Sequence, residues 1–83
     1  MNKATVLGAG SFGTAMAQVL SANFPRVALW GRDEALLSSL TQTHENRNYL
    51  PGLKLHDAVY GEPKLEAALE GSSLIIVATP SHA

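Results

Sequence analysis

The feature that most restricts the fold of this chain is a cluster of three glycines near its N-terminus. They stand in Gly-Ala-Gly-Ser-Phe-Gly-Thr-Ala, residues 8–15, directly after the apolar run Ala4–Leu7. Two unrelated phosphate-binding loops share the spacing G-x-G-x-x-G. One joins a strand to a helix and binds dinucleotides, and the other joins two antiparallel strands in protein kinases. The residues on either side of the glycines must therefore decide between the two loops.

The residues that follow the glycines have the period of a helix. Apolar side chains recur at i, i+3, i+4, i+7 and i+8, and we expect this stripe to face the core. The stripe consists of Phe12, Ala15, Met16, Val19 and Leu20. Pro25 ends the pattern, since the residue before a proline is disfavoured in a helix. A kinase loop would need a second strand here, and a lysine where Trp30 stands. The glycines therefore predict a strand-to-helix turn.

The next two segments predict a second strand and a second helix. Val27–Trp30 is wholly apolar and has the length of a buried strand. Asp33 is a good N-cap for a helix that carries apolar residues at helical spacing. These are Leu36, Leu37 and Leu40. The polar segment Thr41–His56 then predicts a loop with at most one helical turn.

The last part of the chain predicts a third strand–helix pair and a closing strand. Leu55–Tyr60 is expected to hold a short edge strand. Pro63 is suited to the first turn of a helix that runs through Leu69 and stops at Gly71. Leu74–Ala78 is expected to be a buried strand, closed by Thr79-Pro80.

The alternation of strands and helices predicts an α/β fold with a parallel sheet and right-handed crossovers. We expect residues 1–83 to form the N-terminal half of a Rossmann-type doubly wound parallel sheet. This would be a partial dinucleotide-binding domain, truncated after a central strand and without a catalytic or substrate domain. Such a sheet leaves an apolar edge and partly uncovered faces, so we also expect a tendency to form homo-oligomers.

Composition narrows the class of function. The 83 residues are 46% hydrophobic and 16% charged, with a net charge of −1. The chain thus has no excess of basic residues that would indicate binding to nucleic acid or anionic lipid. No apolar run predicts membrane insertion. The absence of cysteine excludes disulfides and thiol chemistry, and it suits a cytoplasmic protein. His44, His56 and His82 lack the spacing of metal ligands, so no metal site is expected.

Each glycine has a predicted part in binding a dinucleotide. Gly8 would permit the turn out of the strand, Gly10 would let the backbone approach the pyrophosphate, and Gly13 would let the helix pack against the sheet. The N–H groups of Ser11, Phe12 and Gly13 would point at the anion from the helix N-terminus.

The residues at the end of the second strand should determine whether NAD or NADP is preferred. An acidic residue there favours NAD, and an arginine can hold the 2′-phosphate of NADP. Arg32 stands at this corner, and Asp33 is better explained as a helix cap. The sequence therefore favours NADP, with NAD also accepted.

Four stretches of the chain resemble the N-terminal part of one family, the bacterial type of NAD(P)-dependent glycerol-3-phosphate dehydrogenase. They are Gly-Ala-Gly-Ser-Phe-Gly-Thr-Ala (8–15), Leu-Trp-Gly-Arg (29–32), Asn-x-x-Tyr-Leu-Pro-Gly (46–52) and Ala-Thr-Pro-Ser-His-Ala (78–83). The third stretch is the most specific, because dinucleotide-binding folds in general do not need it.

The resemblance implies reversible hydride transfer between NAD(P)H and dihydroxyacetone phosphate, giving sn-glycerol 3-phosphate for phospholipid synthesis. It implies that Ser11 and Phe12 contact the cofactor phosphates and that Arg32 contacts the adenosine end. Tyr49 would lie near the cofactor. Pro80 would lie near the nicotinamide. The family's catalytic lysines lie further along a longer chain. Lys3, Lys54 and Lys64 match no family motif and are interpreted as surface residues.

Two other functions stay open at this point. One is a nucleotide-binding module without redox activity, which would use the same glycine turn. The other is an inactive half-domain in which the glycines serve only the turn. The block at 46–52 favours the dehydrogenase over the first of these.

Overall fold

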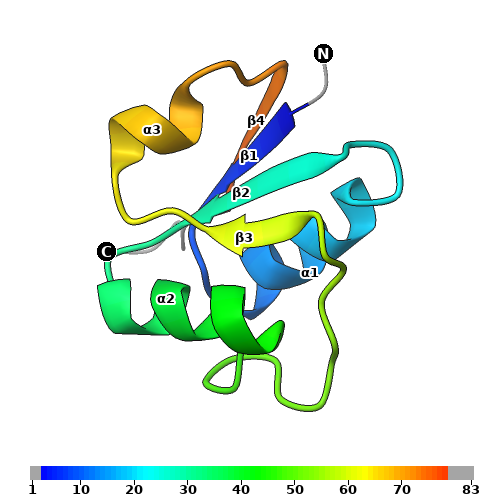
Figure 1. Cartoon of the computed structure of the whole chain (residues 1–83), viewed down its shortest axis with the longest axis vertical. Helices are drawn as coiled ribbons and strands as arrows, with labels where there is room; N and C mark the ends of the chain where they lie inside the picture. Colours follow the sequence, from blue (N-terminus) through cyan, green and yellow to red (C-terminus); the bar gives the residue numbers. More distant parts are fainter. Residues whose placement is uncertain (1–2, 79–83) are drawn as a thin grey trace.

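The computed structural model describes residues 3–78 and shows one parallel sheet flanked by helices (Figure 1). The strand order is β3-β2-β1-β4, and all three neighbouring pairs are parallel. The strands are β1 (Lys3–Leu7), β2 (Arg26–Trp30), β3 (Val59–Gly61) and β4 (Leu74–Val77). The chain adds strands on one side of β1 and then crosses to the other side. This is the strand order of the first half of a doubly wound fold, as predicted.

Three helices connect the strands. They are α1 (Ser11–Leu20), α2 (Glu34–Thr43) and α3 (Leu65–Leu69). In Figure 1, α1 and α2 lie on one side of the sheet and α3 lies on the other. Alternate residues of β1 agree with this division, since Val6 belongs to the core under α1 and α2, whereas Thr5 donates a hydrogen bond to a carbonyl of α3. No helix within residues 3–78 is long and apolar enough to cross a membrane.

The local signals for α2 are confirmed. The Asp33 carboxylate accepts a hydrogen bond from the Leu36 N–H at 3.1 Å, which makes Asp33 the N-cap. The three predicted leucines of this helix are buried. The helix continues three residues beyond Leu40, to Thr43, and ends at His44, whose backbone is left-handed with φ 58°. The loop that follows contains one turn closed by an i→i+4 hydrogen bond, from Leu50 N–H to Asn46 O, and no further helix.

Two predicted boundaries are wrong by a few residues. The edge strand β3 covers Val59–Gly61, at the end of the segment predicted for it and one residue beyond. Helix α3 has Lys64 as its N-cap, so Pro63 precedes the helix instead of standing in its first turn. The helix ends at Leu69, just before Gly71, as expected.

The predicted inner face of α1 is wrong in part. The buried residues are Gly13, Thr14 and Ala17, which are all small, whereas Phe12 is 60% exposed and Val19 is 65% exposed. Small side chains allow the helix axis to approach the sheet closely. The larger apolar residues of the helix therefore lie beside that contact or away from it.

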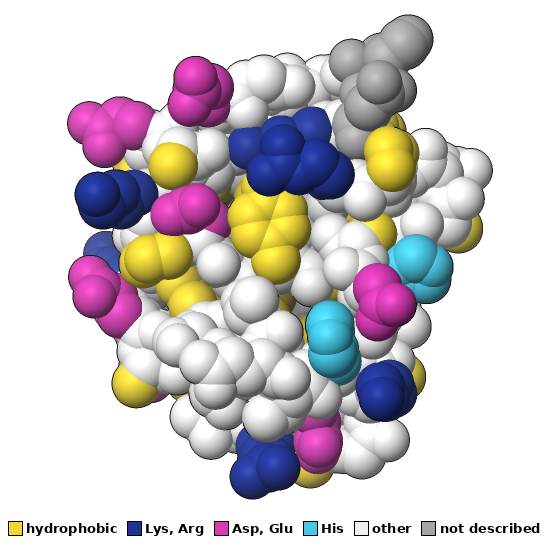
Figure 2. All heavy atoms as spheres, viewed as in Figure 1, with side chains coloured by type: hydrophobic (Ala, Val, Ile, Leu, Met, Phe, Trp, Pro, Cys, Tyr) yellow, Lys and Arg dark blue, Asp and Glu magenta, His cyan; other side chains and the backbone are white. Residues whose placement is uncertain are grey.

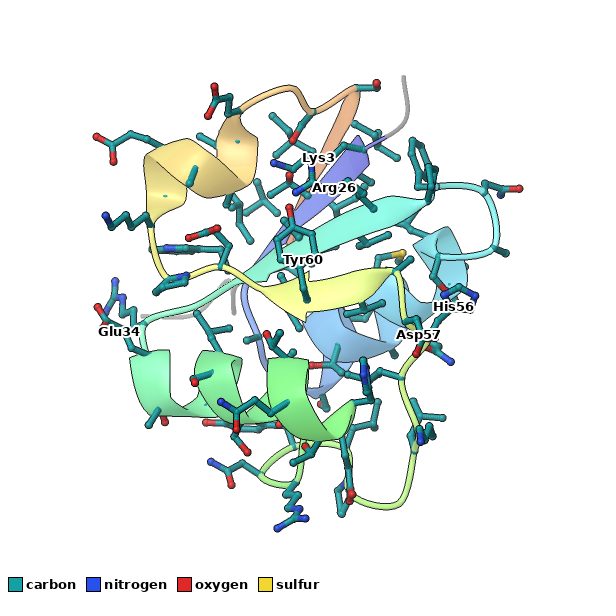
Figure 3. The ribbon with its side chains drawn as sticks, in the orientation of Figure 1. Lys3, Arg26, Glu34, His56, Asp57 and Tyr60 are labelled. Atoms are coloured by element: carbon teal, nitrogen blue, oxygen red, sulfur yellow. The ribbon has the colours of Figure 1, made fainter. Side chains whose placement is uncertain are left out.

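Lys3 is not a surface residue. It is buried, and its ammonium donates hydrogen bonds to Ala67 O at 3.0 Å and Glu70 O at 2.8 Å (Figure 3). These carbonyls belong to the C-terminal end of α3, which lacks intrahelical donors and carries a partial negative charge. Lys3 therefore caps α3 from the first strand. Lys54, by contrast, is exposed, as expected.

β4 was expected to be a buried strand, but in this chain its side chains are largely open. Leu74 is 36% exposed, Ile75 is 47% exposed and Val77 is 68% exposed. It is the last strand on its side of the described sheet and pairs only with β1 there. The apolar pattern predicted the strand correctly but not what covers it.

The face seen in Figure 2 carries acidic and basic side chains that are interspersed. On this face Arg26 donates a hydrogen bond to the Tyr60 hydroxyl at 3.0 Å, and its guanidinium carbon lies 5.2 Å from the ring centroid (Figure 3). This pair joins β2 to β3 at the surface, where such contacts contribute about 0.5–1 kcal/mol.

Candidate functional site

The turn between β1 and α1 has the geometry that its glycines predict. Gly8 has φ 121°, a conformation that side-chain-bearing residues rarely adopt. Its N–H donates to Trp30 O at 2.7 Å, so the turn is joined to the end of β2. A Cβ atom on Gly13 would lie 1.7 Å from Gly8 O, so only glycine allows the helix to pass so close to the turn.

Gly10 differs from Gly13, because a Cβ atom on it would meet no atom of residues 3–78 within 4 Å. Gly10 is the N-cap of α1, and its carbonyl accepts the first helical hydrogen bond, from Thr14 N–H at 3.0 Å. No residue in the range 3–78 accepts a hydrogen bond from the N–H groups of Gly10, Ser11, Phe12 or Gly13. Open space and free donors at a helix N-terminus suit an anion.

The side chains of Ser11 and Phe12 point away from the core. Both residues are exposed, and Phe12 is among the most exposed large hydrophobic residues. Their backbone N–H groups lie in the first turn of α1, so the backbone and not the side chain is what these residues offer to a phosphate.

Arg32 lies at the end of β2 that meets the glycine turn. Its neighbour Gly31 packs against Ala9, since a Cβ atom on Gly31 would lie 3.0 Å from Ala9 Cβ. Arg32 is exposed and directly precedes the Asp33 cap. Because Asp33 is engaged with the α2 backbone, the charged group next to the turn that is available to a ligand is Arg32.

Asn46 also belongs to this site, although the sequence did not predict it. Asn46 is fully buried, and its amide donates to Ala9 O at 3.0 Å and to Thr14 Oγ1 at 2.7 Å. It therefore fastens the 46–52 segment to the glycine turn and to α1. The signal for it in the sequence is its place as the first residue of the Asn-x-x-Tyr-Leu-Pro-Gly block.

Tyr49 is 54% exposed and stands in the turn that begins at Asn46. Its N–H donates to Asn46 Oδ1 at 3.3 Å, and Leu50 N–H donates to Asn46 O at 2.9 Å. The backbone of Tyr49 is thus tied, through Asn46, to the segment that holds the glycine turn. Pro80 lies outside the described residues, as do Thr79 and Ser81.

Within residues 3–78, no three His, Asp or Glu side chains gather as a metal site would require. His44 ends α2, and its Nε2 is 3.9 Å from Asp57 Oδ1. His56 accepts a hydrogen bond from Ala58 N–H through Nδ1. These two histidines therefore have local roles in the loop, and His82 lies outside the described residues.

Comparison with known proteins identifies the family. The family described as NAD-dependent glycerol-3-phosphate dehydrogenase N-terminus matches residues 3–83. The chain belongs to this family. It is 48% identical over 82 residues to a glycerol-3-phosphate dehydrogenase [NAD(P)+] from Stenotrophomonas maltophilia, covering 99% of this chain and 24% of that protein. It is 44% identical over 81 residues to the protein of the same name from Myxococcus xanthus, covering 98% and 24%.

Solved structures agree with the sequence relatives. The glycerol-3-phosphate dehydrogenase of Coxiella burnetii superimposes with a TM-score of 0.86 at 32% identity, over 96% of this chain and 25% of that one. The enzyme of Plasmodium falciparum gives 0.82 at 27% identity, over 90% and 24%. The predicted family and the Rossmann-type fold are therefore confirmed. The chain spans about a quarter of the length of the curated relatives it matches.

Proposed function

We propose that this chain binds the pyrophosphate of NAD or NADP at the turn between β1 and α1. The main supporting observation is at Gly10, where residues 3–78 leave open space and accept no hydrogen bond from the N–H groups of the first helical turn. The position also supports the proposal. The turn lies at the carboxyl end of β1, between β2 and β4, where doubly wound sheets bind their ligands.

The remaining cofactor contacts in the proposal come from three other segments. Arg32 holds the adenosine end and, in NADP, the 2′-phosphate; its exposure and its place beside the turn support this role. Tyr49 lines the site from the 46–52 segment, which Asn46 fastens to the glycine turn. Pro80 contacts the nicotinamide side, a role that rests on the family resemblance alone.

For the whole protein, we propose reversible hydride transfer between NAD(P)H and dihydroxyacetone phosphate, yielding sn-glycerol 3-phosphate for phospholipid synthesis in the cytoplasm. The bound nicotinamide would supply the hydride. The names of the curated relatives support this activity, and these 83 residues act as the cofactor-binding segment. No catalytic role is assigned to any of them. The exposed apolar side chains of β4 support burial by further protein, including a second subunit.

The test is a titration of the full-length protein with NADPH and NADH, followed by fluorescence of the reduced nicotinamide. Arg32→Ala should raise the Kd for NADPH about tenfold and the Kd for NADH much less, since it removes a charge-assisted contact to the 2′-phosphate. Arg26→Ala is the matched control, because Arg26 is an exposed arginine at the opposite end of β2. It should leave both Kd values unchanged.

Three results would contradict the proposal at different levels. If neither NADH nor NADPH binds at millimolar concentration, the proposed binding site is wrong. Equal loss of NADH and NADPH affinity in Arg32→Ala removes the 2′-phosphate contact. Binding without any oxidation of NADH or NADPH by dihydroxyacetone phosphate would identify a nucleotide-binding module without redox activity.

A further inference from the structure

The side chain of Asn46 is the one polar link between the glycine turn and the 46–52 segment among the residues that the structure describes. Its relative exposure is 0%, although it stands in a polar segment. Its amide nitrogen donates to Ala9 O and Thr14 Oγ1, and its oxygen accepts from Tyr49 N–H. Both N–H donors and the oxygen of the side chain thus have a partner, which gives the amide a fixed orientation.

The contact with Ala9 O determines which way a neighbouring donor points. Ala9 O and Gly10 N–H belong to the same peptide unit, and the chain has no cis peptide bond in the described range. In a trans peptide the C=O and the N–H point in opposite directions. Because Ala9 O is directed at the buried amide of Asn46, Gly10 N–H is directed away from it, and no residue in 3–78 accepts its hydrogen bond.

This orientation needs a restraint because residue 10 is a glycine. Rotating the Ala9–Gly10 peptide by half a turn would change φ of Gly10 from its present −79° to a positive value. A residue with a side chain would resist that rotation, but glycine populates positive φ about as readily as negative φ. The rotated peptide would present a carbonyl oxygen where a donor now stands, and it would repel an anion.

We propose that Asn46 is a positioning residue for the phosphate site, holding the Ala9–Gly10 peptide so that the Gly10 N–H faces the cofactor's pyrophosphate. This inference rests on the proposed function and deepens it, by assigning control of one phosphate donor to a side chain 37 residues away in the chain. Asn46 does not touch the cofactor in this proposal. It acts through the peptide that does.

The test compares the full-length protein with Asn46→Asp and with Asn48→Asp. The first variant keeps the oxygen that accepts from Tyr49 N–H but removes both donors. The second makes the same chemical change two residues away, at an exposed position. Calorimetric titration with NADH gives Kd and the number of binding sites separately. Asn46→Asp should raise Kd about tenfold or more, as for loss of one aligned donor to a charged group, with an unchanged number of sites.

The number of sites separates positioning from folding. A variant that merely unfolds in part loses sites, and the molecules that stay folded keep the wild-type Kd. Asn46→Ala, which places no carboxyl group in the interior, gives the same comparison if Asn46→Asp does not fold. A rise in Kd at constant site number supports the proposal, whereas a wild-type Kd in the folded variant overturns it.

A second readout observes the donor itself. In protein labelled with ¹⁵N-glycine, inorganic pyrophosphate should shift the Gly10 amide resonance in the wild type and in Asn48→Asp, and much less in Asn46→Asp. An equal shift in all three overturns the inference while leaving the proposed site intact. If neither pyrophosphate nor NADH binds the wild type, it is the proposed function that fails.

Discussion

Replacing Gly13 by alanine should break the contact between α1 and the turn that precedes it. The new Cβ atom would lie 1.7 Å from Gly8 O and 2.9 Å from Gly8 C, whereas real Cβ contacts are essentially never below 3.0 Å. The obstacle is backbone, so no side-chain rotation relieves it. Overpacking of this kind costs about 3 kcal/mol or more, at the upper end of the usual range. Alanine regains about 1 kcal/mol of helix propensity, which leaves a net loss of at least about 2 kcal/mol.

The assay is urea unfolding of the domain followed by far-ultraviolet circular dichroism. With a slope of about 1 kcal/mol per M for a small domain, the midpoint should fall by about 2 M in Gly13→Ala. Gly10→Ala is the matched control, because among the described residues its Cβ atom would meet no atom within 4 Å, and φ of Gly10 is −79°. It should cost less than about 1 kcal/mol and yet weaken cofactor binding, since the methyl group would occupy the space proposed for phosphate. Equal midpoints for Gly13→Ala and wild type would refute the reasoning.

Three further substitutions test the packing around the sheet, each by the same unfolding assay. Lys3→Met should cost about 1–3 kcal/mol, because it leaves two carbonyls at the end of α3 without their donor. Lys54→Met, at an exposed position, should leave the stability unchanged, and equal effects of the two substitutions would contradict the capping role of Lys3. Asp33→Ala should cost about 1 kcal/mol, with most of it recovered in Asp33→Asn, which keeps the accepting oxygen; no recovery would contradict the cap. Leu37→Ala should cost about 2–5 kcal/mol, since Leu37 is fully buried in the core. A loss below about 1 kcal/mol would contradict this, because it would mean that neighbouring residues fill the space that the leucine leaves.

The elements that sequence predicts best are those whose signals are local. The glycine turn is defined by Gly8, which permits a left-handed backbone, and by the helical period that follows it. The start of α2 is defined by a carboxylate three residues before the N–H that it accepts from. Each of these signals lies within a few residues, so it survives without knowledge of the tertiary structure.

Two of the wrong predictions concern what an element packs against. A helix with apolar residues around much of its circumference can turn more than one face to the core. In α1 the small residues form the inner face, because the helix lies close to the sheet. Lys3 was expected at the surface because lysine is rarely buried. It is buried because the end of α3 supplies carbonyl acceptors, and these come from residues more than 60 positions away.

Three of the four blocks that carry the family resemblance meet at the candidate site, and the fourth lies almost wholly outside the described residues. Ala9 in the first block packs against Gly31 in the second block. The Ala9 carbonyl also accepts a hydrogen bond from Asn46 in the third block. Neither contact can be read from periodicity, because the partners lie 22 and 37 residues apart along the chain. In the role proposed above, the buried amide at position 46 keeps the peptide before Gly10 in a single orientation through its hydrogen bond to Ala9 O. The specificity of Asn-x-x-Tyr-Leu-Pro-Gly then begins with its asparagine, through its contact with the glycine turn.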